Sequence, residues 1–225
     1  MTMDWSPILI SMRTAGLSIV FTFFMGILAA WMVVRISHPL VKTILDGIFT
    51  IPLVLPPTVA GFFLLYVFGV KRPVGQFFLE YFSVKIAFSW GATVLAAVVM
   101  SFPLMYRSAR GAFEQVDDTL VQAARTLGMG EWTIFRKVLL ANAVPGVVSG
   151  GVLAFARGLG EFGATAMIAG NIAGKTRTLP MAVYSEVAAG NMEAAYSYVA
   201  IIVVIAFLSV FLMNGVMWYS QKKSR

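Results

Sequence analysis

The sequence predicts an all-α integral membrane protein with about five transmembrane helices. Its mean hydropathy is +0.84 and only 12% of its residues are charged, whereas soluble proteins average about 25% charged residues. Uncharged apolar stretches of about 20 residues, the length that crosses a bilayer as a helix, recur along the chain. Asp4 and the late Arg13 are unlike the basic start of a signal peptide, so we expect the first apolar stretch to be a retained span.

The five expected spans form one transmembrane domain over residues 1–225. They are about 14–34, 47–70, 86–106, 142–168 and 194–219. An odd number of spans puts the termini on opposite sides of the membrane. Ten lysines and arginines fall on one side and six on the other, and the richer side is expected to be cytoplasmic. This predicts an N-terminus outside, a cytoplasmic C-terminus and a cytoplasmic loop at about 107–141.

Composition excludes several other functions. The chain has no cysteine and a single histidine, His38, so neither disulfides nor a thiolate or histidine metal site is expected. The net charge of +7 is spread between apolar runs, which is a topology signal and not a nucleic-acid surface. No Walker A loop is present for ATP hydrolysis. A membrane enzyme is disfavoured by few and scattered carboxylates, and an inverted-repeat secondary carrier by the lack of a repeat.

The central loop predicts two short helices. Apolar residues at three-and-four spacing, together with Asp117 and Asp118, place a helix start near Asp118, and Thr119 with Gln122 fits a capping box. The run Gly128-Met129-Gly130 should end that helix, and a second one should begin near Glu131. Such a loop is either an amphipathic linker on the membrane surface or a rigid docking element between two spans.

Two charged residues, Arg157 and Glu161, fall near the middle of the fourth expected span. A charge there costs at least about 2.5–3.5 kcal/mol, so something must compensate it. Their spacing of four places both on one helix face, where they can pair. The pair either fixes helix packing or borders an anion pathway in which Arg157 offsets the negative charge of the substrate.

Proline and small residues mark two further features. Pro52, Pro56 and Pro57 interrupt the second span, and broken backbone at membrane depth is tolerated only inside protein or beside a water-filled cavity. We therefore expect residues 51–61 to lie at a translocation path or gate, with a packing kink as the alternative. Small residues in the fourth span are expected to let helices approach closely: Gly146, Ser149, Gly150, Gly151, Ala154, Gly158, Gly160 and Gly163.

The loop residues resemble a known family. Gln122-Ala123-Ala124, then Gly128, then Val138-Leu139-Leu140 have the spacing of the EAA loop of ABC importer permeases, with Gln122 in place of the glutamate and Ala141 in place of the proline. The segments "TIPLVLPPTVAGFFLL", "SFPLMYRSARGAFEQVD" and "LAFARGLGEFGATAMIAGNIAGKTRTLP" resemble those of molybdate ABC transporter permeases. The resemblance spans about residues 10–215, and sulfate and thiosulfate permeases share parts of it.

The resemblance implies the type I ABC importer permease fold, in a prokaryotic inner membrane, and a function in importing molybdate or tungstate, with sulfate or thiosulfate as the alternative. It implies a homodimer in membrane lipid, a separate cytoplasmic ABC ATPase that uses the ATP, an extracytoplasmic oxyanion-binding protein, and no cofactor on this chain. The residues expected to couple to the ATPase are Asp118, Gln122, Ala123, Ala124, Arg125, Leu127, Gly128 and Trp132. Those expected at the pathway or gate are Pro52, Pro56, Pro57, Arg157, Glu161 and Gly163.

Overall fold

The computed structural model describes residues 4–223, with side chains as far as residue 215, and these residues form helices joined by short loops. The basic tail, Lys222 to Arg225, lies outside the described side chains. The elements are α1 (Ser6–Val34), α2 (Pro39–Val54), α3 (Pro57–Phe68), α4 (Pro73–Phe82), α5 (Trp90–Glu114), α6 (Asp118–Thr126), α7 (Glu131–Ile134), a π-helical turn (Phe135–Leu139), α8 (Leu140–Leu159), α9 (Gly163–Ile168), α10 (Leu179–Ala188) and α11 (Met192–Lys223).

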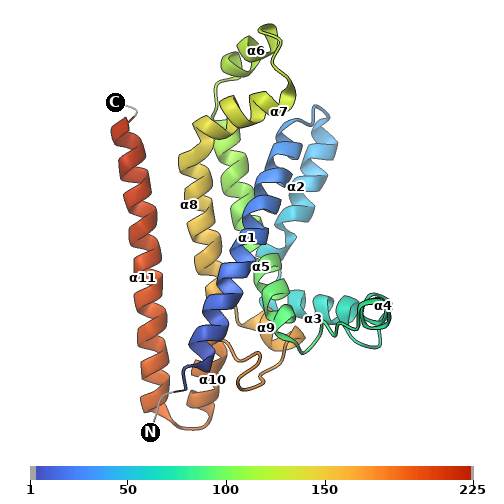
Figure 1. Cartoon of the computed structure of the whole chain (residues 1–225), viewed down its shortest axis with the longest axis vertical. Helices are drawn as coiled ribbons and strands as arrows, with labels where there is room; N and C mark the ends of the chain where they lie inside the picture. The colour runs from blue at the N-terminus through green and yellow to red at the C-terminus, as the bar shows by residue number, and fades with distance from the viewer. Residues whose placement is uncertain (1–3, 224–225) are drawn as a thin grey trace.

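Helices α1, α5 and α8 pack together as the centre of the bundle (Figure 1). Helix α2 lies against α5, and α11 lies against α8 and α10. Four helices are long and apolar enough to cross a membrane, or five if α2 and α3 count as one span. Helix α6 and the end of α11 lie at one end of the bundle, and the start of α1 lies at the other (Figure 1).

Small residues bring α5 and α8 into close contact, as the sequence predicts. A Cβ atom added to Gly146 would lie 2.7 Å from the Cβ of Ala112, and one added to Gly150 would lie 2.5 Å from the Cβ of Ser108. Between α1 and α5, buried hydroxyl pairs add hydrogen bonds that the sequence analysis did not identify. Thr14 and Thr93 are 2.9 Å apart, and Thr22 and Ser101 are 3.1 Å apart. Such bonds stabilise helix pairs where water is absent.

Three expected boundaries need correction. The window 47–70 is not one straight span, because the chain bends by 110° between α2 and α3, and α3 and α4 project sideways from the bundle (Figure 1). In the fourth expected span, 142–168, helix α8 ends at Leu159, and residues 163–168 form the separate helix α9. Helix α5 continues to Glu114, so the first residues of the expected loop at 107–141 are still helical.

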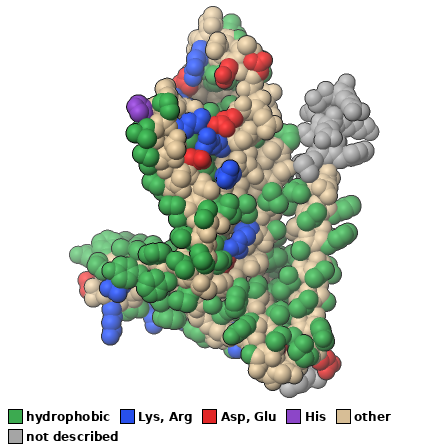
Figure 2. All heavy atoms as spheres, turned by 180° about the vertical axis from the view of Figure 1, so that it is seen from behind, with side chains coloured by type: hydrophobic (Ala, Val, Ile, Leu, Met, Phe, Trp, Pro, Cys, Tyr) green, Lys and Arg blue, Asp and Glu red, His purple; other side chains and the backbone are tan. Residues whose placement is uncertain are grey.

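The surface is apolar over most of the helical bundle. Figure 2 shows hydrophobic side chains along the bundle and over the sideways arm, with charged side chains gathered towards the α6 end. On α11, Phe207 and Phe211 are 69% and 66% exposed. Because aromatic rings so exposed are costly in water, this face is suited to contact with lipid.

Candidate gate and coupling segment

The candidate gate is the place where two interrupted helices meet. Helix α2 ends at Val54, and the amide of the next residue, Leu55, still donates to the carbonyl of Ile51. Pro56 precedes the first turn of α3. Pro52 lies inside α2, one turn before this break. The structure therefore confirms that the proline cluster interrupts the helix, and it locates the interruption at Leu55 and Pro56.

Helix α3 packs directly on α9, the short helix after the second interruption. A Cβ atom added to Gly163 would lie 2.9 Å from the Cβ of Pro57, and one added to Gly61 would lie 2.6 Å from the Cα of Ala164. Two of the residues expected at the gate, Pro57 and Gly163, are thus brought into contact from distant parts of the chain. Backbone this close requires glycine on at least one side.

Arg157 and Glu161 pair, as their spacing predicts. The guanidinium Nη1 of Arg157 donates to Oε2 of Glu161 over 2.6 Å, and Oε1 of Glu161 accepts from the amide of Ala164 over 2.7 Å. The Glu161 side chain is 1% exposed and that of Arg157 is 28% exposed. The position differs from the expectation of mid-helix, because Arg157 lies in the last turn of α8 and Glu161 lies beyond it. The pair therefore joins the end of α8 to the start of α9.

The coupling segment, which we define as residues 115–134, lies at the opposite end of the bundle from the start of α1 (Figure 1). Its helix α6 begins at Asp118 and ends before Gly128, whose φ is +73°, as the sequence predicts. The expected cap at Thr119 is wrong. Asp117 caps the helix instead, by accepting from the Thr119 amide over 2.9 Å.

Helix α6 has one buried residue, Ala124, which faces the rest of the chain. Gln122, Ala123 and Arg125 are exposed, and Leu127 is 81% exposed. Trp132, on α7, is 57% exposed and packs against Trp31 and Phe135, with ring centroids 5.9 and 5.2 Å away. Most of the expected coupling residues on α6 thus lie on its outward face, Ala124 faces inward, and Trp132 makes an aromatic contact with α1.

Sequence reasoning missed two groups of charged residues. Glu131 accepts from Arg125 over 2.9 Å and lies 3.3 Å from Arg35. A second cluster joins α2 to α5, where Arg110 pairs with both Asp46 and Glu114, and Lys42 lies 3.0 Å from Glu114. Only the Arg110–Glu114 pair had a local signal, its spacing of four on one helix.

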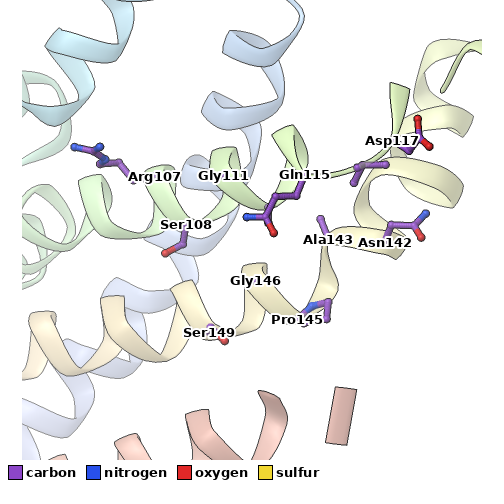
Figure 3. A pocket seen from close by; sticks show the side chains of 12 residues that line it. Arg107, Ser108, Gly111, Gln115, Asp117, Asn142, Ala143, Pro145, Gly146 and Ser149 are labelled. Atoms are coloured by element: carbon purple, nitrogen blue, oxygen red, sulfur yellow. The ribbon is translucent and has the colours of Figure 1, made fainter. Parts of the chain in front are cut away.

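A groove of about 690 Å³ lies beside the coupling segment, between α5 and α8. Figure 3 shows Ser108 on α5, and Gln115 just after the end of α5, facing the α8 side of this groove, with Asp117 at the end next to α6. Ser149 of α8 also lines the groove. The Ser149 hydroxyl is buried and has no hydrogen-bond partner among the described residues. Because the two walls are the helices on either side of the coupling segment, any shift between these helices changes the width of the groove.

Replacing Asp117 by alanine is expected to loosen the first turn of α6, because the Thr119 amide loses its acceptor. Backbone amides of the first α6 turn should then exchange with solvent deuterium roughly threefold faster. The matched control is Asp118→Ala, since the Asp118 carboxylate accepts no hydrogen bond among the described residues. Equal exchange in both variants would contradict the assignment of the cap.

The same cap has a defined pH dependence. The Thr119 amide holds the pKa of the Asp117 carboxyl below its usual range. A carboxyl whose pKa is lower in the folded chain than in the unfolded chain stabilises the fold at pH values above the unfolded pKa. This stabilisation is lost as the pH falls through the pKa of the folded chain. The difference in amide exchange rate between Asp117→Ala and the unchanged chain should therefore have its full size at pH 7 and should shrink below about pH 4.

Residues 22–225 match the family described as "Binding-protein-dependent transport system inner membrane component". The chain belongs to this family. It is therefore a multi-pass membrane protein and a permease subunit, which is the non-catalytic part of such a transporter. The fold prediction, an all-α membrane protein of the type I ABC importer permease class, is confirmed.

Individual relatives of this permease agree with the family match. It is 41% identical over 98% of its length to the molybdenum transport system permease protein ModB of Escherichia coli K12, of which 96% is covered. It is 33% identical over 91% of its length to the sulfate transport system permease protein CysT of Salmonella typhimurium, of which 73% is covered. Its fold resembles the inward-facing MetNI methionine ABC transporter, with a TM-score of 0.72, 18% identity, and 95% and 94% of the two chains covered.

Proposed function

We propose that this chain is the membrane-spanning subunit of an ATP-driven importer that moves molybdate, and tungstate as its close chemical relative, into the cell. The observation that carries the proposal is the 41% identity to the E. coli molybdenum permease over nearly the full length of both chains. The sulfate permease is more distant, at 33%, and 73% of it is covered.

In this proposal two copies of the chain form the pore in the lipid of a prokaryotic inner membrane, with the N-terminus outside and the C-terminus cytoplasmic. An extracytoplasmic binding protein delivers the oxyanion. A cytoplasmic ATPase subunit binds and hydrolyses ATP, and this chain itself binds no cofactor. The excess of basic residues at the α6 end supports the orientation.

The geometry supplies a route from the ATPase to the gate. The exposed face of α6, with Gln122, Ala123 and Leu127, is available to a partner. From Glu131 to Leu159 the chain is helical without a break, although α7 lies across the end of α8 (Figure 1). The 20 residues of α8 alone are about 30 Å long. At its far end the Arg157–Glu161 pair joins α8 to α9, and α9 packs on α3. A rigid-body shift of α6 would therefore reach both interruptions.

At the gate, the chain's own groups perform two tasks. The glycine contacts between α3 and α9 allow the interrupted helices to close tightly on each other, which excludes water when the gate is shut. The partly exposed Arg157 guanidinium offers positive charge where an oxyanion passes, while Glu161 neutralises it between transport events. ATP binding and hydrolysis would switch between the two arrangements by favouring one of them.

The test is uptake of labelled molybdate by cells with and without this chain. Deletion should abolish uptake, excess tungstate should compete, and excess sulfate should compete little. Uptake should also collapse when ATP is depleted while the membrane potential is held constant, because a secondary carrier would continue. Strong competition by sulfate would move the assignment to the sulfate importers, and unchanged molybdate entry after deletion would overturn it.

A further inference from the structure

Helix α6 is weakly attached to the rest of the chain. Among the described residues its substantial packing is limited to α7 and the π-helical turn, and Ala124 is its one buried residue. The turn at Gly128 connects it covalently to α7. A short helix held in this way needs additional contacts if its movements are to be followed by more than one span.

Glu131 provides those contacts. Its two carboxylate oxygens accept from Nε and Nη2 of Arg125, over 2.9 and 3.4 Å, so the ion pair with Arg125 of α6 is bidentate. The same carboxylate lies 3.3 Å from Nη2 of Arg35, the residue that ends α1. One carboxylate thus lies between two guanidinium groups that belong to different helices.

The Arg35 side of this contact packs on aromatic rings. The Arg35 guanidinium lies over the Trp31 ring at 4.8 Å, and Trp31 packs against Phe135 with centroids 4.7 Å apart. Phe135 begins the π-helical turn, a backbone form that is common at functional sites. The end of α1, the start of α7 and the turn before α8 therefore form one packed unit around Glu131.

We infer that Glu131 is a positioning residue that couples α6 to α1, so that a movement imposed on α6 reaches α1 as well as α8. Helix α1 carries the movement across the bundle, because it packs on α5 and α8 along its length and contacts α10. At its far end the Ser11 hydroxyl accepts from the amide of Leu179, over 2.7 Å, which ties α1 to the start of α10. This inference rests on the proposed function, since it presumes that α6 receives the ATPase.

The charges explain why a carboxylate is needed at this position. Arg35 and Arg125 would repel each other across a neutral residue, whereas Glu131 attracts both. The side chains are 41–53% exposed, so each pair alone is weak in water and contributes little to overall stability. Their loss should therefore change how well the helices move together more than whether the protein folds.

The experiment uses the complete transporter in proteoliposomes, with molybdate uptake and ATP hydrolysis measured together. Glu131→Gln should lower the molybdate imported per ATP by about threefold or more, in keeping with the loss of two weak pairs. The amount of ATPase subunit bound to the permease and the melting temperature should stay unchanged. The matched control is Glu193→Gln, at the opposite end of the bundle, because Glu193 is exposed and forms no ion pair among the described residues.

A variant that keeps the charge tests the ion pair. Arg35→Lys keeps a positive charge beside Glu131 and leaves the exposed face of α6 unchanged, so it should retain most of the uptake per ATP. Arg35→Gln alone leaves the Arg125–Glu131 pair intact and should reproduce the defect of Glu131→Gln. If Glu131→Gln does not assemble, Arg35→Gln serves as the test of the coupling between α6 and α1. Wild-type uptake per ATP in Arg35→Gln would overturn the inference. If the transporter without any substitution imports no molybdate, the proposed function is overturned instead.

Discussion

Replacing Arg157 by glutamine is expected to stop oxyanion import and to destabilise the transporter. The change leaves the Glu161 carboxylate buried at 1% exposure without its cation. An unpaired buried charge of this kind costs about 3–5 kcal/mol. Uptake should fall by more than about tenfold, as expected when over 1.4 kcal/mol of a required interaction is lost.

A second variant separates the two interpretations of this pair. Changing both residues, in Arg157→Gln with Glu161→Gln, removes the unpaired charge, and a glutamine at 161 can still accept from the Ala164 amide. The thermal stability of the purified complex should therefore recover. If the guanidinium serves the passing oxyanion, uptake stays low in this double variant. If the pair only fixes helix packing, uptake recovers together with stability.

Arg157→Lys completes the series. It keeps the positive charge and loses the planar guanidinium, which is the better partner for a carboxylate or an oxyanion. We expect intermediate uptake with stability close to that of the unchanged protein. Uptake equal to that of the glutamine variant would show that the geometry of the guanidinium, and not its charge alone, is required at this position.

The sequence predicted those parts of the site that depend on residues close together in the chain. The start of α6 near Asp118 and its end at Gly128 follow from residues within one turn. The pairing of Arg157 with Glu161 follows from a spacing of four. The cap was assigned to Thr119 instead of Asp117 because both can cap a helix and only the backbone geometry chooses between them.

The features that sequence could not predict depend on contacts between distant segments. Arg35 and Glu131 are far apart in the chain, and nothing local to either residue indicates their contact. The prolines predicted an interruption in the second span, but the 110° angle follows from the packing of α3 on α9. The expected fourth span ran past Leu159 because apolar residues continue there, whereas the helix ends where Glu161 turns to accept from Ala164.

Changing Gly61 to alanine is expected to separate α3 from α9 and to impair import. The added Cβ would lie 2.6 Å from the Cα and 2.8 Å from the carbonyl oxygen of Ala164. Both are backbone atoms, so no side-chain rotation can relieve the contact, and the two helices must move apart. Overpacking of this kind costs about 1–3 kcal/mol, which should lower the melting temperature of the complex.

The control for Gly61→Ala is Gly47→Ala in α2, the other half of the same interrupted span. A Cβ added at Gly47 meets nothing within 4 Å, so this variant should import normally. Alanine also favours a helix over glycine by about 1 kcal/mol, which opposes the expected loss in Gly61→Ala and makes any measured defect an underestimate of the steric effect. Normal uptake and stability in Gly61→Ala would mean that the close contact of α3 with α9 is dispensable. A loss of uptake at unchanged stability would instead place this contact in the gate itself.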